Sequence, residues 1–252
     1  MERQIYREFV RILEEELVPA MGCTEPIAVA YAAALARSVL GRCPEEILVR
    51  ASANIIKNVK SVVVPNTGGL RGIAAAAAAG VAVGREEKKL EVLSEVTPEQ
   101  IGEVKKLIDT LDCVVEQADN DRVFYIEVTV KGGGHTARVE IADHHTNVTA
   151  IERDGQVLRQ GSDQAWEPRR AADRSLLTVE RIVEFADCAR IEDIQAVLQR
   201  QIDCNTAIAQ EGLRGDYGAN IGSILLNAYG DSVQNRAKAY AAAGSDGRMN
   251  GC

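Results

Sequence analysis

The sequence predicts a mainly helical α+β protein that carries a small inserted α+β lobe. Two observations favour this class: Ala-rich apolar segments near both ends of the chain repeat at helical spacing, and the segments between residues 113 and 153 alternate with the period of two of half-solvated antiparallel strands. We expect the helical catalytic domain at residues 1–88 and 159–252, sharing one core, and the lobe, a sheet plus a helix, at residues 89–158.

The first two helices have clear boundaries in the sequence. Residues 1–20 place apolar side chains at helical spacing between charged ones, and Pro19 closes the run. In the next segment Thr24 is a suitable N-cap, Pro26 stands in the first turn and Gly41 ends the helix. Because residues 27–40 are apolar on nearly every side, this helix is expected inside the protein.

A polar loop separates the next strand from the next helix. Residues 47–55 look like a strand, and Val62–Pro65 leads into the loop 66–69, which precedes an Ala-rich helix over 70–83. Backbone N–H groups at the start of that helix, with the amide of Asn66 and the hydroxyl of Thr67, suit the binding of a carboxylate. Ordinary turn and cap chemistry explains the same residues equally well.

The remaining elements follow the same patterns. The lobe begins with a strand at 90–93 and a helix from Thr97 to Leu111, and Gly132–Gly134 and Asp154–Gly155 supply hairpin turns. A polar stretch, 160–173, leads back to helices, and a glycine-rich loop is expected over 244–252. The other strands are expected at 113–116, 122–130, 136–141 and 147–153, and the later helices at 179–186, 191–205 and onward, 219–228 and 233–243.

Composition limits the function classes. The chain has 252 residues, of which 46% are hydrophobic and 26% charged, so it is long and apolar enough to bury a core. Its net charge of -8 leaves no basic surface for phosphates, which argues against nucleic acid as a partner. The N-terminus lacks the apolar region of a signal peptide, and the longest apolar stretch, 73–83, is too short for a bilayer. We therefore expect a cytoplasmic protein without a membrane partner.

Cysteine and histidine residues are the candidates for chemistry. Six cysteines are scattered without CxxC spacing, which argues against a disulfide framework and a local zinc site. Cys23 stands at the start of an apolar helix, where the macrodipole favours a thiolate, although a cysteine packed under a turn is the alternative. Cys204 lies in an apolar helical segment and is expected to be packed. The adjacent His144 and His145 would point to opposite faces of a strand, which favours a structural role over a metal site.

Four motifs together resemble the L-cysteine desulfidase family, relatives of the iron–sulfur L-serine dehydratase alpha chain. The likeness covers essentially the whole chain, and it implies an oxygen-sensitive 4Fe–4S cluster. It also implies β-elimination from L-cysteine or L-serine, which yields pyruvate, ammonia and sulfide or water. The motifs are Met21–Pro26, Val64–Gly68, Asn205–Gly212 and Ala243–Cys252.

The resemblance assigns roles to two cysteines, and residue type suggests roles for six further residues. Cys23 and Cys252 are implied as cluster ligands; three thiolates would bind three irons and leave the fourth open as a Lewis acid. Glu25 is the candidate catalytic residue, with the reservation that any carboxylate suits a first helical turn. The residues expected to orient the carboxylate and amine of the substrate are Asn66, Thr67, Gly68, Asp246 and Arg248.

Members of this family continue past the last motif, into a glycine-rich segment and a further cysteine that complete the cluster site. We therefore expect an N-terminal fragment, or a chain whose remainder is a separate polypeptide, that is inactive alone and holds an incomplete cluster or none. The alternative function is a catalytically inactive amino-acid-binding or assembly subunit of the same fold. A small amino acid is the expected ligand, and the Ala-rich helices with few aromatic residues, 4%, allow a homodimer.

Overall fold

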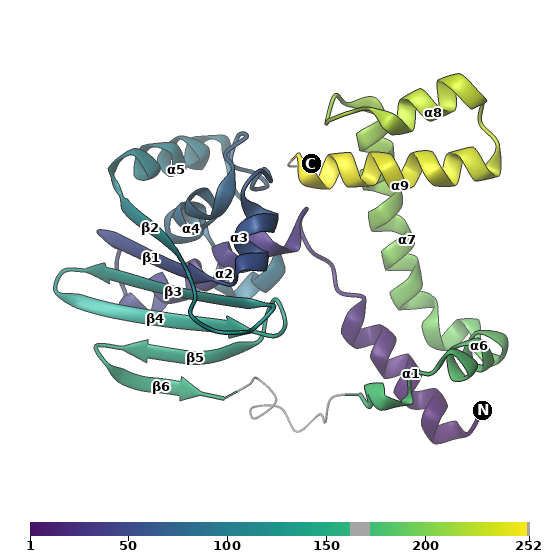
Figure 1. The fold of residues 1–252 in the computed structure, drawn as a ribbon, viewed down its shortest axis with the longest axis horizontal. Helices are drawn as coiled ribbons and strands as arrows, with labels where there is room; N and C mark the ends of the chain where they lie inside the picture. The colour runs from purple at the N-terminus through teal and green to yellow at the C-terminus, as the bar shows by residue number, and fades with distance from the viewer. Residues whose placement is uncertain (162–171, 251–252) are drawn as a thin grey trace.

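The computed structural model describes residues 1–161 and 172–250 and confirms the α+β class (Figure 1). In these residues, helices dominate both ends of the chain and a mixed sheet occupies its middle. The helices are α1 (Arg3–Glu16), α2 (Thr24–Leu40), α3 (Ala53–Val59), α4 (Gly72–Val83), α5 (Pro98–Thr110), α6 (Val179–Cys188), α7 (Ile191–Arg214), α8 (Ile221–Tyr229) and α9 (Val233–Met249), with short 3-10 turns η1 (Glu86–Glu91) and η3 (Arg174–Leu176). The strands are β1 (Glu46–Ala51), β2 (Asp112–Gln117), β3 (Tyr125–Gly132), β4 (His135–Ala142), β5 (Val148–Arg153) and β6 (Gln156–Gln160).

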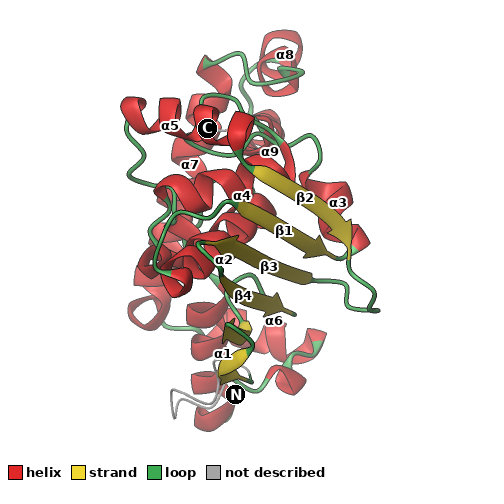
Figure 2. Cartoon of the chain, turned by 90° about the vertical axis from the view of Figure 1, so that its left-hand side faces the viewer, coloured by secondary structure: helices red, strands yellow, loops and turns green. Residues whose placement is uncertain are grey.

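The sheet has the order β2-β1-β3-β4-β5-β6 in the described residues. Only the β1–β2 pair is parallel, and every other pair is antiparallel. Figure 2 shows the helices α2 and α4 on one face of the sheet, while the other face is not covered by helices. The predicted hairpin turns at Gly132–Gly134 and Asp154–Gly155 are confirmed, because they connect β3 to β4 and β5 to β6.

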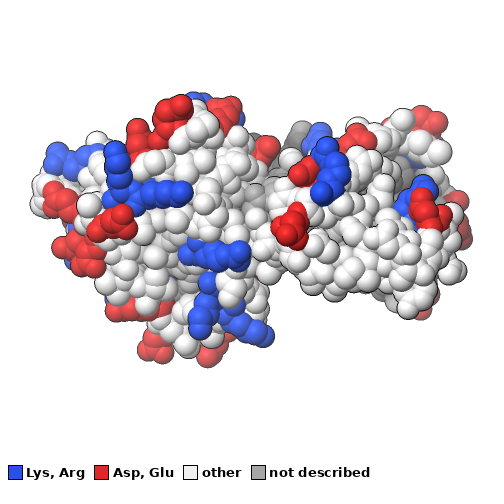
Figure 3. Space-filling view, turned by 90° about the horizontal axis from the view of Figure 1, so that it is seen from above, with Lys and Arg blue, Asp and Glu red and all other residues white. Residues whose placement is uncertain are grey.

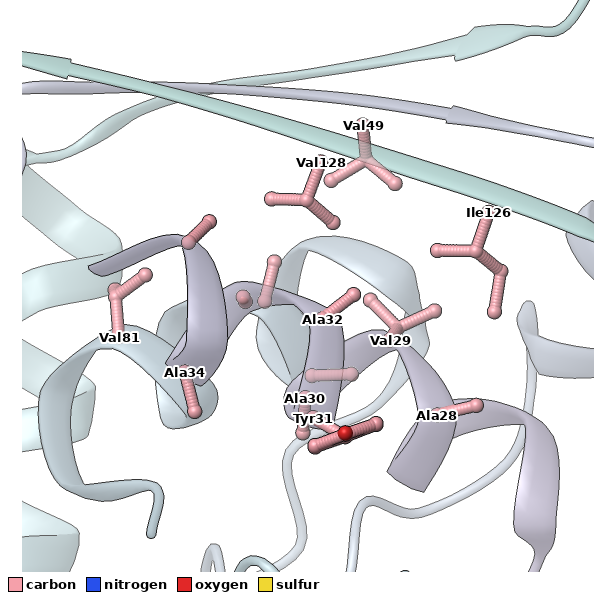
Figure 4. Packing of buried hydrophobic residues seen from close by; sticks show 14 of the residues in the cluster. Ala28, Val29, Ala30, Tyr31, Ala32, Ala34, Val49, Val81, Ile126 and Val128 are labelled. Atoms are coloured by element: carbon pink, nitrogen blue, oxygen red, sulfur yellow. The ribbon is translucent and has the colours of Figure 1, made fainter. Parts of the chain in front are cut away.

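The core lies between the sheet and the helices α2 and α4. Val29 of α2 points toward Val128 and Ile126 of the sheet, as Figure 4 shows, and all three side chains are fully buried. On its other side α2 packs on α4 so closely that a Cβ added at Gly80 would lie 2.2 Å from the carbonyl oxygen of Ala30. This double contact explains why α2 is apolar on every side.

The predicted division between domains is wrong at its first boundary, residues 88/89. The strand β1 pairs with β2 and β3, and α2 and α4 belong to the same apolar cluster as the sheet, so residues 20–160 form one unit. The physical reason is that α2 has apolar side chains on both sides, one packed on the sheet and the other on α4. The helix α1 instead packs on α6, where Tyr6 and Phe9 both contact the ring of Phe185.

Three local predictions also differ from the structure. Residues 53–55, expected as the end of a strand, instead begin α3, and residues 90–93, expected as strand, lie at and beyond the end of η1, where Lys89 has a φ of 49°. Residues 244–249, expected as a loop, are the last turns of α9. They stay helical because Ala239, Ala243 and Gly247, four residues apart, form a buried small-residue face. Within the described residues, no helix combines the length and the apolarity that a membrane crossing requires.

Candidate functional site

The first motif places a thiol and a carboxylate in contact at the amino end of α2. Cys23 is the N-cap residue, with an extended backbone, and its Sγ donates a hydrogen bond to Oε2 of Glu25 at 3.1 Å. Asn58 of α3 donates its amide to Oε1 of the same carboxylate at 3.4 Å. Glu25 therefore links the start of α2 to α3 by accepting hydrogen bonds from the Cys23 thiol and from the Asn58 amide.

This environment opposes the predicted thiolate at Cys23. Burial is the main cause that raises the pKa of the thiol to about 11, and the hydrogen bond and charge of Glu25 add to it. Arg248, at the end of α9, acts in the opposite direction. Burial and Glu25 thus outweigh Arg248 in setting the pKa of this thiol, and the role of Cys23 as a metal ligand stays a prediction.

The carboxylate of Glu25 stays ionised in the same site. Burial raises its pKa, but hydrogen bonds from Cys23, from its own backbone N–H and from Asn58, with the nearby His145, outweigh burial and lower the pKa below its usual value. His145 lies in the turn between β4 and β5 and not on a strand, and its ring packs on Phe124 at 4.5 Å between centroids. Burial lowers the pKa of His145.

A cavity of about 710 Å³ lies between the segment that precedes α2 and the helices α7 and α9. Three of the four sequence motifs contribute to its wall, although they are far apart along the chain. Its polar and charged side chains come mainly from α7 and from Arg248, and its apolar side from the segment before α2. The motif residues that line it are Met21, Gly22, Thr24, Asn205, Ala207, Ile208, Glu211 and Arg248, and Cys204, next to the third motif, lines it too.

The residues on either side of the second motif are hydrogen-bonded to the fourth motif. The backbone N–H of Val63 donates to the carbonyl oxygen of Met249 at 3.1 Å, and Arg71 contacts the side-chain oxygen of Asn250 at 3.5 Å. Val63 and Arg71 also form a β-bridge with each other, which closes the base of the loop between them. The loop that carries Asn66 to Gly68 is therefore held beside the carboxyl end of α9.

Within that loop, the side chains expected to bind substrate make internal contacts. The amide of Asn66, a residue with a φ of 55°, donates to the carbonyl oxygen of Leu93 at 3.0 Å. The hydroxyl of buried Thr67 donates to the carbonyl oxygen of Val64 at 2.7 Å. Gly68 has a φ of 70°, and a Cβ there would meet Ile101 at 3.0 Å. These contacts hold the loop shape, and the role of the three residues in substrate binding stays a prediction.

The two candidate residues of α9 face different ways. Arg248 lines the cavity and donates its Nε to the carbonyl oxygen of Gly244 at 3.1 Å. Asp246 packs against the α7–α8 connection, where a Cβ added at Gly218 would lie 2.9 Å from its Oδ1. Two residues that are two positions apart on a helix cannot share a face, so the structure brings Arg248 but not Asp246 to the cavity. Cys252, the second predicted cluster ligand, lies outside the described residues.

The sequence analysis did not predict that a whole face of α7 lines the cavity. Cys204 was expected to be packed, but it is exposed and lines the cavity together with Arg200 and Asn205. The signal was the helical spacing of Arg200, Cys204, Ile208 and Glu211, which places these side chains on one face. Among residues 1–161 and 172–250, no group of three or more His, Cys, Asp or Glu side chains is arranged to hold a metal ion.

Comparison with known proteins shows similarity to longer bacterial proteins. The chain is 50% identical to a UPF0597 protein of Desulfitobacterium hafniense over 100% of this chain and 59% of the relative. It is 42% identical to one of Fusobacterium nucleatum and 37% identical to one of Treponema denticola, each over 100% of this chain and 60% of the relative. The chain thus spans about three-fifths of the length of these relatives, whose names state no activity. No family model matches the chain, and no solved structure matches it either.

Proposed function

We propose that the protein is an iron–sulfur-dependent lyase that eliminates sulfide from L-cysteine, or water from L-serine, to yield pyruvate and ammonia. The observation that carries the proposal is the convergence of the four motifs. Motifs one, three and four line one cavity, and Val63 and Arg71, which flank motif two, are hydrogen-bonded to Met249 and Asn250 of motif four. Segments as far apart in the sequence as residues 21–26 and 243–252 have no local structural reason to meet at one place, which favours a shared site.

The proposal assigns part of a cluster site to the described residues. Cys204 lies in the wall of the cavity, and Cys23 stands between Gly22 and Thr24, which line it, whereas Cys252 is outside the described residues. Because these residues include no group that would hold a metal by itself, the described part of the chain does not fit a complete 4Fe–4S site, and further ligands would have to come from elsewhere. A bound cluster would supply a Lewis-acidic iron for the leaving group.

The chain's own residues have roles that need no cluster geometry. Glu25, ionised and hydrogen-bonded to Cys23, is placed to take the proton that the thiol gives up when it becomes a thiolate. Arg248 favours that thiolate and presents a guanidinium to the cavity, where a substrate carboxylate would bind it. The cavity, at about 710 Å³, has room for a small amino acid.

The test is an anaerobic assay of this chain and of the intact D. hafniense relative, after reconstitution with iron and sulfide. We expect the relative to be brown and to release pyruvate from L-cysteine or L-serine. In this chain, we expect Cys23→Ser to lower the amount of bound iron at least severalfold. The matched control is Cys43→Ser, because Cys43 is exposed and lies outside the cavity.

Two outcomes would contradict the proposal. If the relative is colourless and inert after anaerobic reconstitution, the proposed lyase activity is wrong. Tight binding of an amino acid without turnover, measured by isothermal titration, would instead support the alternative of an inactive binding subunit.

A further inference from the structure

The helices α6 to α9, called here the helical arm, leave apolar side chains uncovered. In α6 the residues Val179, Ile182, Val183 and Ala186 follow the spacing i, i+3, i+4, i+7 of an amphipathic helix. Such a stripe normally faces a core, yet Val179 is 75% exposed, Ile182 47% and Val183 54%. Phe185 is the buried residue of this helix, and it faces α1.

The helix α8, at the other end of α7, also exposes apolar side chains that a helix of this kind normally buries. It is one of the most apolar helices of the chain, with the sequence IGSILLNAY, but Gly222 is its only buried residue. Gly222 contacts α9, where a Cβ would lie 2.6 Å from the carbonyl oxygen of Ala239. On the opposite side Ile221 and Ile224 are 50% and 58% exposed, and Ala228, one turn further, is exposed as well.

The helix α7, which connects these two helices, also has few buried residues. The helix α7 has 24 residues, of which only Ala209 and Gly212 are buried, both near the contact with α9. Figure 1 places α6 and α8 near opposite ends of α7, and Figure 3, which looks down on α8 and α9, shows a broad surface there without charged side chains. Soluble monomers rarely expose several apolar helix stripes on one arm unless another surface covers them.

We propose that these stripes are the docking surface for the polypeptide segment that the UPF0597 relatives carry outside the matched region. The match covers all of this chain, and therefore the whole arm, but only 59% of the D. hafniense protein. About two-fifths of that relative is thus additional chain, which is large enough to reach both ends of a helix that is about 36 Å long. The arm also forms part of the cavity, since α7 and Arg248 of α9 line it.

The experiment co-expresses this chain with a tagged copy of that additional D. hafniense segment and measures their ratio after capture. We expect capture in equal amounts, and at least a tenfold loss for Ile182→Asp and for Ile224→Asp, because each change puts a charge into a buried apolar contact. The matched control is Val157→Asp on β6: Val157 is 50% exposed and lies outside the arm, so it should leave capture unchanged. All four proteins are compared by circular dichroism, which should show equal helix content.

A second measurement avoids dependence on the folding of an isolated segment. Hydrogen exchange is followed in this chain alone and in the intact D. hafniense relative, and the peptides that match α6 and α8 should exchange at least tenfold more slowly in the relative. The proposal fails if protection is equal, if the aspartate variants are captured like wild type, or if this chain alone forms a dimer that Ile182→Asp or Ile224→Asp dissociates. No assay here reads turnover, so the interface and the proposed lyase can fail separately.

Discussion

At the scale of single residues, Cys23 shows how opposing local effects are balanced. The amino end of α2 and Arg248 favour the thiolate, whereas burial and a carboxylate 3.1 Å away favour the thiol. The helix dipole acts from partial charges, but Glu25 carries a full charge and accepts the hydrogen bond. The sum raises the pKa of the thiol to about 11, so Cys23 needs either a metal or the loss of the Glu25 charge to become a thiolate near neutral pH.

The substitution Glu25→Gln tests this balance in the chain without added iron. It removes the charge that, after burial, raises the pKa of Cys23, so the pKa should fall below about 11 toward the ordinary thiol value of 9.0, and thiolate should form at lower pH. The measurement is the pH dependence of alkylation by iodoacetamide, resolved for each cysteine by mass spectrometry. Cys113 is an internal control, because burial is the main cause of its similarly raised pKa. An unchanged midpoint for Cys23 would show that Glu25 does not control this thiol.

At the scale of elements, the approach of α2 to α4 depends on one missing side chain. A Cβ at Gly80 would overlap the backbone of Ala30, which cannot move without displacing α2 from the sheet. We therefore expect Gly80→Ala to lower the free energy of unfolding by about 1–3 kcal/mol, as overpacking of a core does. Gly102→Ala in α5 is the matched control: a Cβ there meets nothing within 4 Å, so it should raise stability by up to about 1 kcal/mol. Urea unfolding measures both, and a neutral Gly80→Ala would contradict the close contact.

The ion pairs of Glu127 on the open face of the sheet lead to a second prediction at the scale of elements. Arg138 donates to Glu127 at 2.8 Å and to Glu140 at 2.8 Å, and Arg50 also reaches Glu127, which is 7% exposed. Burial raises the pKa of Glu127, but these arginines and Tyr125 outweigh it and lower the pKa below its usual value. A lowered pKa in the folded state adds stability that is present above the unfolded pKa of about 4.5 and is lost as the pH falls through the folded value.

We therefore expect Glu127→Gln to cost about 1–3 kcal/mol at pH 7, and progressively less below about pH 4.5. Urea unfolding of both proteins between pH 3 and pH 7 measures the difference. Glu103→Gln, which changes a charge on exposed α5, should have little effect over the same range. A cost that does not depend on pH would show that packing, and not the charge of Glu127, is what the substitution removes.

At the scale of the whole molecule, the sequence predicted which elements exist better than how they assemble. Period and caps located α2, α4, α5 and most strands, because those signals are local. The partner of α2 could not be predicted, since an all-apolar helix packs equally well on helices or on a sheet. The same holds for the candidate site: its residues could be predicted from local motifs, but their relative placement could not. The motifs indicated that Cys23, Asn205 and Arg248 belong together, but only the fold shows that Asp246 points away and that Thr67 is bonded to its own loop.

This assembly predicts uneven stability along the chain. Residues 20–160 share one large apolar core, whereas α6 to α9 bury Phe185 and otherwise only alanine and glycine residues: Ala209, Gly212, Gly222, Ala239, Ala243, Gly244 and Gly247. Local opening costs less where less apolar surface is buried, so amides of α6 and α8 should exchange at least 100-fold faster than those of α2 and β3. Native-state hydrogen exchange of this chain measures the ratio. Equal protection that persists on dilution would show that the arm is stable alone, and protection lost on dilution would show that a second copy covers it.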